Sequence, residues 1–400
     1  MTSLKEYTEG RTTFLTADIE QYTTEKKQPT MDMPVFYNPR MRINRDLSVL
    51  FLAAYMEHNK VELMCEPLAG SGVRTLRYLN EIPGDFQAIL GDVNPTAIDT
   101  AKKNLEKHEF SERGKVIRED AKVLLLTESR GKRFDFVDID PFGTPVPYLN
   151  AAIQSLNPRG ALLGVTATDM PALCGVYPHV SLRKYGGLST RAPFVHEIAV
   201  RLLLGRVYDI AAMNDCAIRP LGVLSTDHYI RAWIHIKTDR TQANRQIDSI
   251  GRIRVCQKCY AYDSIPLSKS ADIRFVHEKE GCKGSPSMAG PLWIGDLYDS
   301  KHIQAVIRLY EKDSESYHKR IKILLELMEM EQGLVKYPYT DLHILCDMYN
   351  LTPPRRDAVI NALIAEGYRA VQTHFQPTAI RTDAPNSEVV KIIRNLTGAE

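Results

Sequence analysis

The stretch VELMCEPLAGSGVRT, residues 61–75, decides the fold of this chain. It predicts an apolar strand that runs into a glycine-rich turn and then into a helix that begins at Val73. Gly70 and Gly72 let the backbone turn sharply and approach a ligand closely, and the start of the helix offers free N–H groups and a positive dipole end. A dinucleotide fingerprint has a third glycine where this chain has Thr75, so the pattern argues against NAD.

Acidic residues follow the turn at the ends of later predicted strands. Asp92 comes about twenty residues on, at the tip of the second strand, where a carboxylate suits a bidentate hold on ribose hydroxyls. Asp120 follows the next strand, and Asp140 follows the one after it. One glycine pair alone would indicate an ordinary tight turn, but this ordered set predicts a nucleoside cofactor without a pyrophosphate.

The apolar run at residues 134–139 ends in Asp140-Pro141-Phe142-Gly143. An open α/β sheet places its ligand at the carboxyl ends of its strands. Here the chain offers a carboxylate, a carbonyl without a neighbouring N–H and an aromatic ring, a set that suits an exocyclic amine on a base. The alternative is a strand that ends in a turn, with Phe142 in the core. Asp138 points to the same face as Asp140 and either orients the amine or binds a loop behind the strand.

At this point the chain resembles the tRNA guanine-26 N2-dimethyltransferases of the archaeal type, which use S-adenosylmethionine. The similarity covers nearly the whole chain. It is carried by Glu9-Gly10, residues 35–41, residues 44–48, residues 68–74, Asp138–Gly143 and residues 289–295.

The resemblance implies a set of cofactor contacts. It carries Arg45 over as a contact, and a guanidinium suits the methionine carboxylate. The other implied contacts have competing structural roles. Phe36 either packs over the cofactor or lies in the core, Arg74 either contacts the cofactor or is solvated, and Asp120 either accepts from the adenine amine or caps the helix that begins at Ala121. The full expected set is Phe36, Arg45, Gly70, Gly72, Arg74, Asp92, Asp120 and Ala121.

The expected reaction is in-line transfer of a methyl group from a sulfonium to N2 of guanine, giving N2,N2-dimethylguanosine. That nitrogen is a poor nucleophile because its lone pair is delocalised into the ring. Acceptors at Asp140 and the Pro141 carbonyl favour its rehybridisation, and Phe142 is the stacking candidate. The guanine must leave its stack to reach such a pocket, so base flipping is expected.

Alternating strands and helices from Val61 to Asp140 predict an α/β fold with a doubly wound, mostly parallel sheet. An antiparallel pair at residues 216–236 completes the S-adenosylmethionine-dependent methyltransferase fold that the resemblance implies. We expect this domain, with an N-terminal extension, at residues 1–240, and a polar linker at Lys237–Arg252. A C-terminal α+β domain for tRNA binding is expected at residues 241–400, with a winged-helix-like segment at residues 340–381.

Composition agrees with a soluble globular chain. The 400 residues are 44% hydrophobic and 25% charged, and they are enough for two or three domains. The net charge of +2 does not by itself argue for nucleic-acid binding. No signal peptide or transmembrane helix is expected, and the seven cysteines form no disulfide framework. These features predict a cytoplasmic protein away from membranes, and they identify no protein partner.

Cys256-Gln257-Lys258-Cys259 has the spacing of half a structural zinc site. Cys282 offers a third thiolate, but Lys279 stands where a second Cys-x-x-Cys pair would have its first cysteine. Either His277 or Glu278 completes the tetrahedron, or residues 256–282 form a knuckle that has lost its metal.

Basic residues are the candidates for tRNA contact, although each alone is more often a solvated charge. Arg355 and Arg356 open the predicted recognition helix of the winged-helix-like segment, and the alternative is a segment that serves packing only. The candidates are Arg252, Arg254, Arg355 and Arg356, with Arg183, Lys184, Arg191 and Lys258 beside them.

Two other functions compete with the methylation of tRNA. An amino-methyltransferase acting on DNA would usually carry two prolines after its Asn or Asp, whereas this chain has Pro141 alone. A non-catalytic RNA-binding protein with a degenerate methyltransferase fold is the other alternative. The intact residues Gly70, Gly72, Asp92 and Asp140 argue against it.

Overall fold

The computed structural model describes all residues except 1–3, 24–31, 227, 270–272 and 399–400. By contacts the chain divides into two compact units. Unit one comprises Met1–Thr166, Trp233–Thr238 and Lys301–Leu325, and unit two comprises Ala167–Ala232, Asp239–Ser300 and Glu326–Glu400. The predicted boundary at residue 240 divides the chain by function rather than by contacts, and that functional division stays a prediction.

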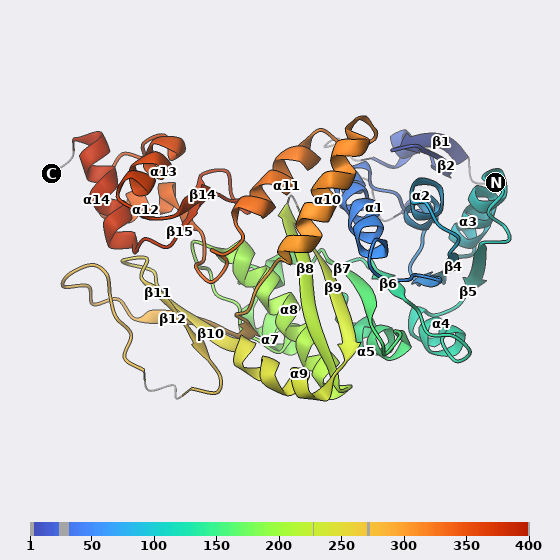
Figure 1. The fold of residues 1–400 in the computed structure, drawn as a ribbon, viewed down its shortest axis with the longest axis horizontal. Helices are drawn as coiled ribbons and strands as arrows, with labels where there is room; N and C mark the ends of the chain where they lie inside the picture. Colours follow the sequence, from blue (N-terminus) through green and yellow to red (C-terminus); the bar gives the residue numbers. More distant parts are fainter. Residues whose placement is uncertain (1–3, 24–31, 227, 270–272, 399–400) are drawn as a thin grey trace. The chain divides into compact units, whose positions relative to one another are not determined.

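Unit one is built on parallel strands that alternate with helices (Figure 1). Strands β3 and β4, β4 and β5, β3 and β6, and β6 and β7 pair in parallel. The elements in chain order are β1 (Leu4–Glu9), β2 (Thr12–Ala17), η1 (Ile19–Tyr22), η2 (Pro39–Met41), α1 (Arg42–Met56), β3 (Leu63–Glu66), α2 (Val73–Glu81), β4 (Gln87–Asp92), α3 (Pro95–Lys107), β5 (Gly114–Arg118), α4 (Ala121–Glu128), β6 (Phe136–Ile139), α5 (Val146–Ser155), β7 (Ala161–Ala167, which ends one residue into unit two), α10 (Ser300–Lys312) and η4 (Ser314–Ser316).

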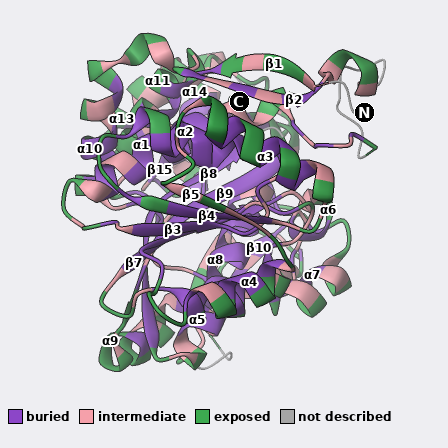
Figure 2. Ribbon diagram, turned by 90° about the vertical axis from the view of Figure 1, so that its right-hand side faces the viewer, coloured by how far each residue is buried: buried purple, intermediate pink, exposed green. Residues whose placement is uncertain are grey.

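The seven-stranded sheet has the order β5-β4-β3-β6-β7-β9-β8. Strands β8 (Cys216–Thr226) and β9 (Tyr229–Thr238) are neighbours at its end, as expected from the sequence. The unit division passes through β9 at residue 233. This topology confirms the predicted α/β fold with a mostly parallel sheet, and Figure 2 shows its strands as largely buried.

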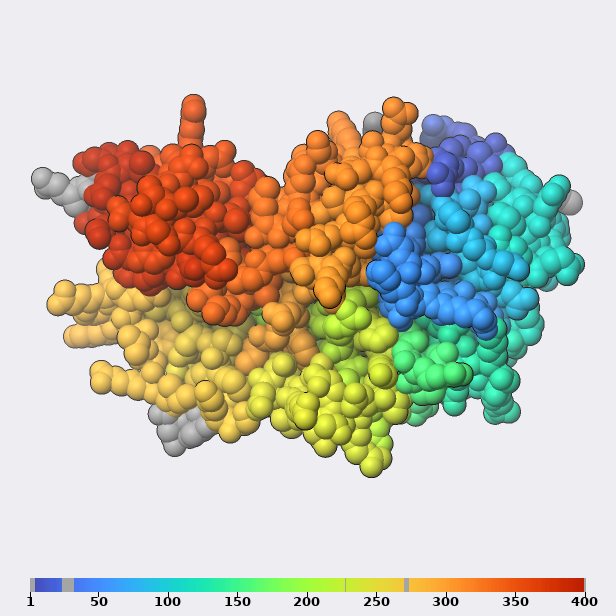
Figure 3. All heavy atoms as spheres, in the orientation of Figure 1, coloured from blue at the N-terminus to red at the C-terminus, as the bar shows by residue number. Residues whose placement is uncertain are grey.

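A late segment of the chain completes unit one. Helix α10 packs on α1, where the ring of His302 lies 5.3 Å from that of Phe51 and Arg308 pairs with Glu57. In Figure 3 the orange residues of this segment lie against the blue residues of the N-terminal part. The N-terminal hairpin β1–β2 also belongs to this unit and was not predicted.

Unit two contains two small sheets and helices around them. One sheet has the order β11-β10-β12 and the other β13-β15-β14. Helix α11 (Arg320–Met330) is shared between the units. The remaining elements of unit two are α6 (Met170–Leu173), α7 (Pro178–Tyr185), α8 (Val195–Met213), α9 (Arg240–Arg245), η3 (Gln246–Ser249), β10 (Ile250–Cys256), β11 (Tyr262–Pro266), β12 (Pro286–Trp293), β13 (Thr340–Asp341), α12 (Leu342–Tyr349), α13 (Arg356–Ala365), β14 (Ala370–Gln372), β15 (Ala379–Thr382) and α14 (Asn386–Thr397).

Two sequence-based expectations have clear outcomes here. Two helices and an antiparallel pair, β14 with β15, form the winged-helix-like arrangement expected at residues 340–381. The linker predicted at Lys237–Arg252 is wrong, because this stretch folds into α9, η3 and the start of β10. Asp239 accepts a hydrogen bond from the N–H of Gln242 and starts α9, and Ala243 anchors it in the core.

Within the described ranges, no helix combines the length and the apolar character that crossing a membrane requires.

Candidate active site and cysteine cluster

The turn after β3 has the geometry that its glycines allow. Gly70 and Gly72 adopt φ values of 52° and 75°, a region that L side chains rarely occupy. A Cβ on Gly72 would lie 3.0 Å from the Leu90 side chain and 3.3 Å from Ala101. Gly72 is also the N-cap of α2 and caps it with no side chain. The turn therefore places the start of α2 at the carboxyl edge of the sheet without a side-chain cap from Gly72.

Asp92 closes this turn from the neighbouring strand. Its Oδ2 accepts a hydrogen bond from the N–H of Gly70 at 3.0 Å, and its Oδ1 accepts one from the N–H of Asn94 at 2.9 Å. Asp120 caps α4, accepting from the N–H groups of Lys122 and Val123. Asp120 therefore has the helix-capping role that the sequence offered as one of its two alternatives. Ala121, next to it, is buried.

The two aspartates of β6 lie in different surroundings. Asp138 is fully buried and accepts a hydrogen bond of 2.6 Å from the hydroxyl of Tyr78. Asp140, just beyond the strand, pairs with Arg74, and its side chain remains 21% exposed. Asp138 therefore supports the site from within the core, whereas Asp140 is accessible to a ligand.

Arg74 is the residue that organises this group. Its guanidinium is buried, and it donates to Asn44 Oδ1 at 2.9 Å and to Ser48 Oγ at 3.2 Å as well as to Asp140. Its Nε lies 3.8 Å from Asp138 and also 3.8 Å from Glu66. The sequence left open that Arg74 is a solvated surface residue. That alternative is wrong, because its side chain is buried against residues of α1, β3 and β6.

Glu66, at the end of β3, belongs to the same cluster and was not predicted. It accepts hydrogen bonds from the N–H and the hydroxyl of Thr75. Burial, with a further contribution from the nearby Asp138, raises the pKa of Glu66 to about 8, although Arg74 and the hydrogen bonds from Thr75 oppose the shift. Its only signal in the sequence is a carboxylate at the end of a strand that otherwise reads as buried.

Two aromatic rings meet beside Asp140. The rings of Phe36 and Phe142 lie 4.5 Å apart, edge to face at 77°. Phe142 is 58% exposed, so its predicted alternative as a core residue is wrong. Phe36 is half-buried, and its carbonyl oxygen lies 3.4 Å from the position of a Cβ on Gly70. The glycine turn, Asp140 and an exposed ring therefore share one edge of the sheet.

Arg45 is held by a protein carboxylate. It donates to Glu9 Oε2 at 2.7 Å and Oε1 at 2.5 Å, and its guanidinium stacks over the ring of Tyr37. Burial opposes the ionisation of Glu9, but Arg45 and Arg77 outweigh it and lower the pKa of Glu9 to about 2. A contact between Arg45 and a cofactor stays a prediction.

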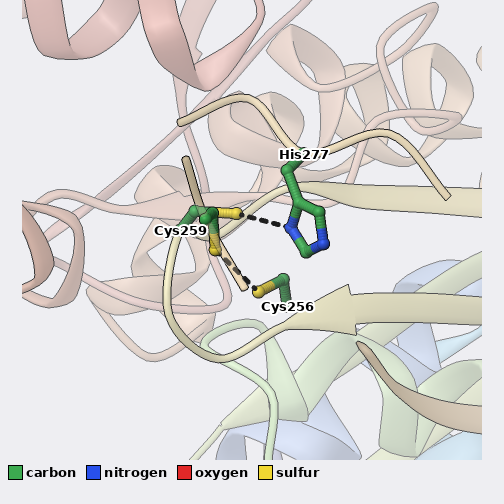
Figure 4. Close-up of side chains that lie close together, drawn as sticks. Cys256, Cys259 and His277 are labelled. Atoms are coloured by element: carbon green, nitrogen blue, oxygen red, sulfur yellow. Dashed lines mark hydrogen bonds between the residues drawn. The ribbon is translucent and has the colours of Figure 1, made fainter. Parts of the chain in front are cut away.

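Three cysteines and a histidine come together in unit two, where Cys256, Cys259 and His277 point toward one another (Figure 4). With Cys282 they place four ligand atoms within 4.8 Å of one another. Of the two predicted alternatives, His277 rather than Glu278 completes the group. The carboxylate of Glu278 instead accepts from the N–H of Ser387 at 2.9 Å.

The four arginines predicted to contact tRNA differ in their exposure and in the protein groups that already bind them. Arg254 pairs with Asp263 and donates to the carbonyl of Ile273, so its charge is largely compensated. Arg356 donates to the carbonyl of Pro377. Arg355 is exposed at the N-cap of α13, and Arg252 is half-buried on β10. Arg355 is therefore the most accessible of the four.

Comparison with known proteins gives one consistent result. The family model described as N2,N2-dimethylguanosine tRNA methyltransferase matches residues 11–394. A tRNA (guanine(26)-N(2))-dimethyltransferase of Methanococcus maripaludis is 34% identical over 98% of both chains. One from Methanothermobacter thermautotrophicus is 36% identical over 91% of this chain and 93% of its own.

A solved structure agrees with these sequence matches. The structure of Trm1 from Pyrococcus horikoshii in complex with S-adenosyl-L-methionine has a TM-score of 0.81 and 28% identity, and the match covers 98% of this chain and all of that one. The glycine turn, the Asp-Pro-Phe-Gly edge and the mostly parallel sheet thus occur in a chain that belongs to the N2,N2-dimethylguanosine tRNA methyltransferase family.

Proposed function

We propose that this protein is a tRNA (guanine-26-N2)-dimethyltransferase that transfers methyl groups from S-adenosylmethionine to N2 of guanine 26. Its family, the names of its relatives and the cofactor in the Pyrococcus structure support the proposal. The observation that carries it is the position of Asp140, an accessible carboxylate paired with Arg74 beside the exposed ring of Phe142.

The residues fit a nucleoside cofactor at the glycine turn. Gly70 and Gly72 carry no Cβ, and α2 begins at Gly72 without a side-chain cap, while Asp92 and Glu66 hold the N–H groups of Gly70 and Thr75. We assign the cofactor to Phe36, Arg45, Gly70, Gly72, Arg74, Asp92, Asp120 and Ala121. When bound, S-adenosylmethionine supplies a methyl group on a sulfonium, which is a good leaving group.

Asp140 and the carbonyl of Pro141 would accept the N–H groups of the guanine amine, so that its lone pair faces the methyl carbon. Asp140 would take the proton that the amine loses as the bond from carbon to sulfur breaks and the bond from carbon to nitrogen forms. Arg74 positions Asp140, and Asp138 supports Arg74 from the core. Phe142 stacks on the flipped base. Holding the two reactants in line supplies much of the rate.

Zinc is part of this proposal. A tetrahedron with Zn–S bonds of about 2.3 Å has S···S edges of about 3.8 Å. The sulfurs of Cys256 and Cys282 lie 3.8 Å apart, and Cys259 Sγ lies 3.4 Å from His277 Nδ1. The donor set and its spacing therefore fit a structural zinc ion held by three thiolates and one imidazole.

The tRNA-binding role is assigned to the C-terminal part, residues 241–400, with catalysis at residues 1–240. Arg355 and Arg356 begin α13, the second helix of the winged-helix-like segment, where a recognition helix meets nucleic acid. Arg252 and Arg254 add positive charge on β10. Such a protein works in the cytoplasm, where its tRNA substrate is found.

The test is methyl transfer from labelled S-adenosylmethionine to an unmodified tRNA transcript, with nucleoside analysis of the digest. We expect N2,N2-dimethylguanosine, which disappears when guanine 26 is replaced. Methylation of DNA instead would favour the amino-methyltransferase alternative. Loss of cofactor binding with retained tRNA binding would favour a non-catalytic RNA-binding protein.

A further inference from the structure

The segment Met170–His196 of unit two is unusual in its charge. It contains no aspartate or glutamate, but it contains Arg183, Lys184 and Arg191 as well as two histidines. Lys184 pairs with Asp169 just before the segment. Within the described part of the chain, the side chains of Arg183 and Arg191 make no ion pair, and both are exposed. The segment therefore presents uncompensated positive charge.

Apolar side chains are exposed on the same segment. Tyr177 is 57% exposed, and Val176 and Leu182 are each 44% exposed. They lie at the turn between α6 and α7 and on α7, which Figure 2 shows mostly in the exposed and intermediate colours. An exposed aromatic ring on the same segment as cations is the combination that proteins use to bind single-stranded nucleic acid, because every base has a face on which a ring can stack.

The backbone under these side chains is braced. The N–H of Val176 donates to the carbonyl of Pro171 at 2.9 Å, and the hydroxyl of Ser189 donates to the carbonyl of Leu173 at 2.6 Å. A Cβ on Gly175 would lie 2.8 Å from the backbone of Thr190. Tyr177 is therefore exposed on a braced backbone, so little conformational freedom is lost when a base stacks on its ring.

The segment continues into the cysteine cluster. Gln257 donates to the carbonyl of Arg191 at 2.7 Å, and Leu188 exchanges backbone hydrogen bonds with Gly290 on β12. Lys258 follows Gln257 directly. The positive charge of α7 thus continues toward a basic residue between two of the proposed zinc ligands.

We propose that this α6–α7 surface, formed by Val176, Tyr177, Leu182, Arg183 and Arg191, binds tRNA. Tyr177 stacks on an unpaired nucleotide, and the two arginines contact phosphates. Three exposed apolar side chains are too few for a stable protein interface, which buries about 800 Å² on each partner, whereas the uncompensated charge complements a polyanion. The inference rests on the proposed function, because it assigns a further part of the substrate contact.

The test compares tRNA binding by Tyr177→Ala and Arg183→Ala in the full-length protein, without cofactor and at several salt concentrations. We expect Tyr177→Ala to raise the Kd about tenfold and Tyr177→Phe to restore it, since stacking needs the ring alone. Arg183→Ala should reduce the salt slope of binding by about one. The KM for tRNA should rise in both variants, while the affinity for S-adenosylmethionine stays the same.

Met213→Ala and Arg245→Ala are the matched controls, since both residues are exposed in unit two outside this surface. Wild-type Kd and salt slope in both test variants, with an active parent enzyme, would overturn the inference. A parent protein that binds tRNA but forms no methylated guanosine would contradict the proposed function instead, and the binding data would still decide the role of this surface.

Discussion

Arg74 shows how a single residue connects the core to the proposed chemistry. The sequence indicates a cofactor contact, because Arg74 follows the glycine turn. The structure adds that the same guanidinium pairs with Asp140 and contacts Asn44 and Ser48 of α1. Its planar fork directs its donors to several acceptors in fixed geometry, whereas the donors of an ammonium group rotate about a single point charge.

Substitution of this pair should reduce catalysis without preventing tRNA binding. We expect Asp140→Asn to lower kcat about a hundredfold or more, because the carboxylate that accepts from the amine is lost. Arg74→Lys should lower kcat by a smaller factor, since the charge remains but the fork is lost. Steady-state kinetics and a tRNA binding assay check both. An Asp140→Asn enzyme with most of its activity would refute the assigned role.

Glu66 should make stability depend on pH. Its pKa of about 8 means that the folded protein holds a proton that the unfolded chain releases above pH 4.5. The proton on Glu66 therefore stabilises the folded protein fully below pH 4.5, and this stabilisation is lost as the pH rises to 8. The free energy of unfolding falls by no more than about 1.4 kcal/mol per pH unit over that range.

Urea unfolding of the wild type and of Glu66→Gln at pH 5.5 and 7.5 measures this effect. The glutamine variant should lose less stability over that interval than the wild type. Glu106→Gln, at an exposed position of α3, is the control and should follow the wild type. Equal pH dependence in all three proteins would contradict the assignment.

At the scale of elements, the cysteine cluster joins the end of β10 to the chain between β11 and β12. Strands β10, β11 and β12 form a small sheet, and the chain between β11 and β12 carries His277 and Cys282. Four ligands from separate positions along the chain would be joined by one ion. Such sites contribute directly to folding.

Removal of zinc should therefore destabilise unit two. We expect about one zinc ion per chain by elemental analysis and a lower Tm after chelation, with recovery when zinc is added back. His277→Ala should lose the metal. Glu278→Ala, beside it but outside the cluster, should retain it. Purified protein without zinc that is indifferent to chelators would show that the knuckle has no metal.

At the scale of the whole molecule, each unit contains its own buried ion network. In unit one, Arg77 pairs with Asp46 at 2.5 Å and with Glu81 at 2.9 Å. In unit two, Arg381 on β15 pairs with Glu197 at 3.0 Å and with Glu331 at 2.8 Å. Glu81 lies one turn from Arg77 on α2, but Asp46, Glu197 and Glu331 are far from their arginines in the sequence, so these pairs form only when each unit is folded.

Loss of Arg381 should destabilise the protein strongly. Arg381→Met removes a buried cation from both Glu197 and Glu331, which retain Arg201 and His374 as partners, and we expect a loss of about 3 kcal/mol in the free energy of unfolding. Urea unfolding measures it. Arg240→Met removes an exposed pair with Asp215 and should leave stability nearly unchanged. A similar, small effect of both substitutions would show that the buried network contributes little.

The sequence by itself determined the α/β class, the glycine turn and the Asp-Pro-Phe-Gly edge, because these depend on local patterns of apolar residues, glycines and strand ends. It also indicated the winged-helix-like segment and three of the four cluster ligands. Local spacing is enough for each of these features.

Only the tertiary structure decided which partners these residues have. It selected His277 over Glu278, brought Glu66 to Arg74, and paired Arg45 with Glu9. It also placed residues 301–325 in unit one, although the segments on both sides of them in the sequence belong to unit two. The physical reason is that burial and ion pairing depend on contacts between distant parts of the chain, which no local pattern of residues records.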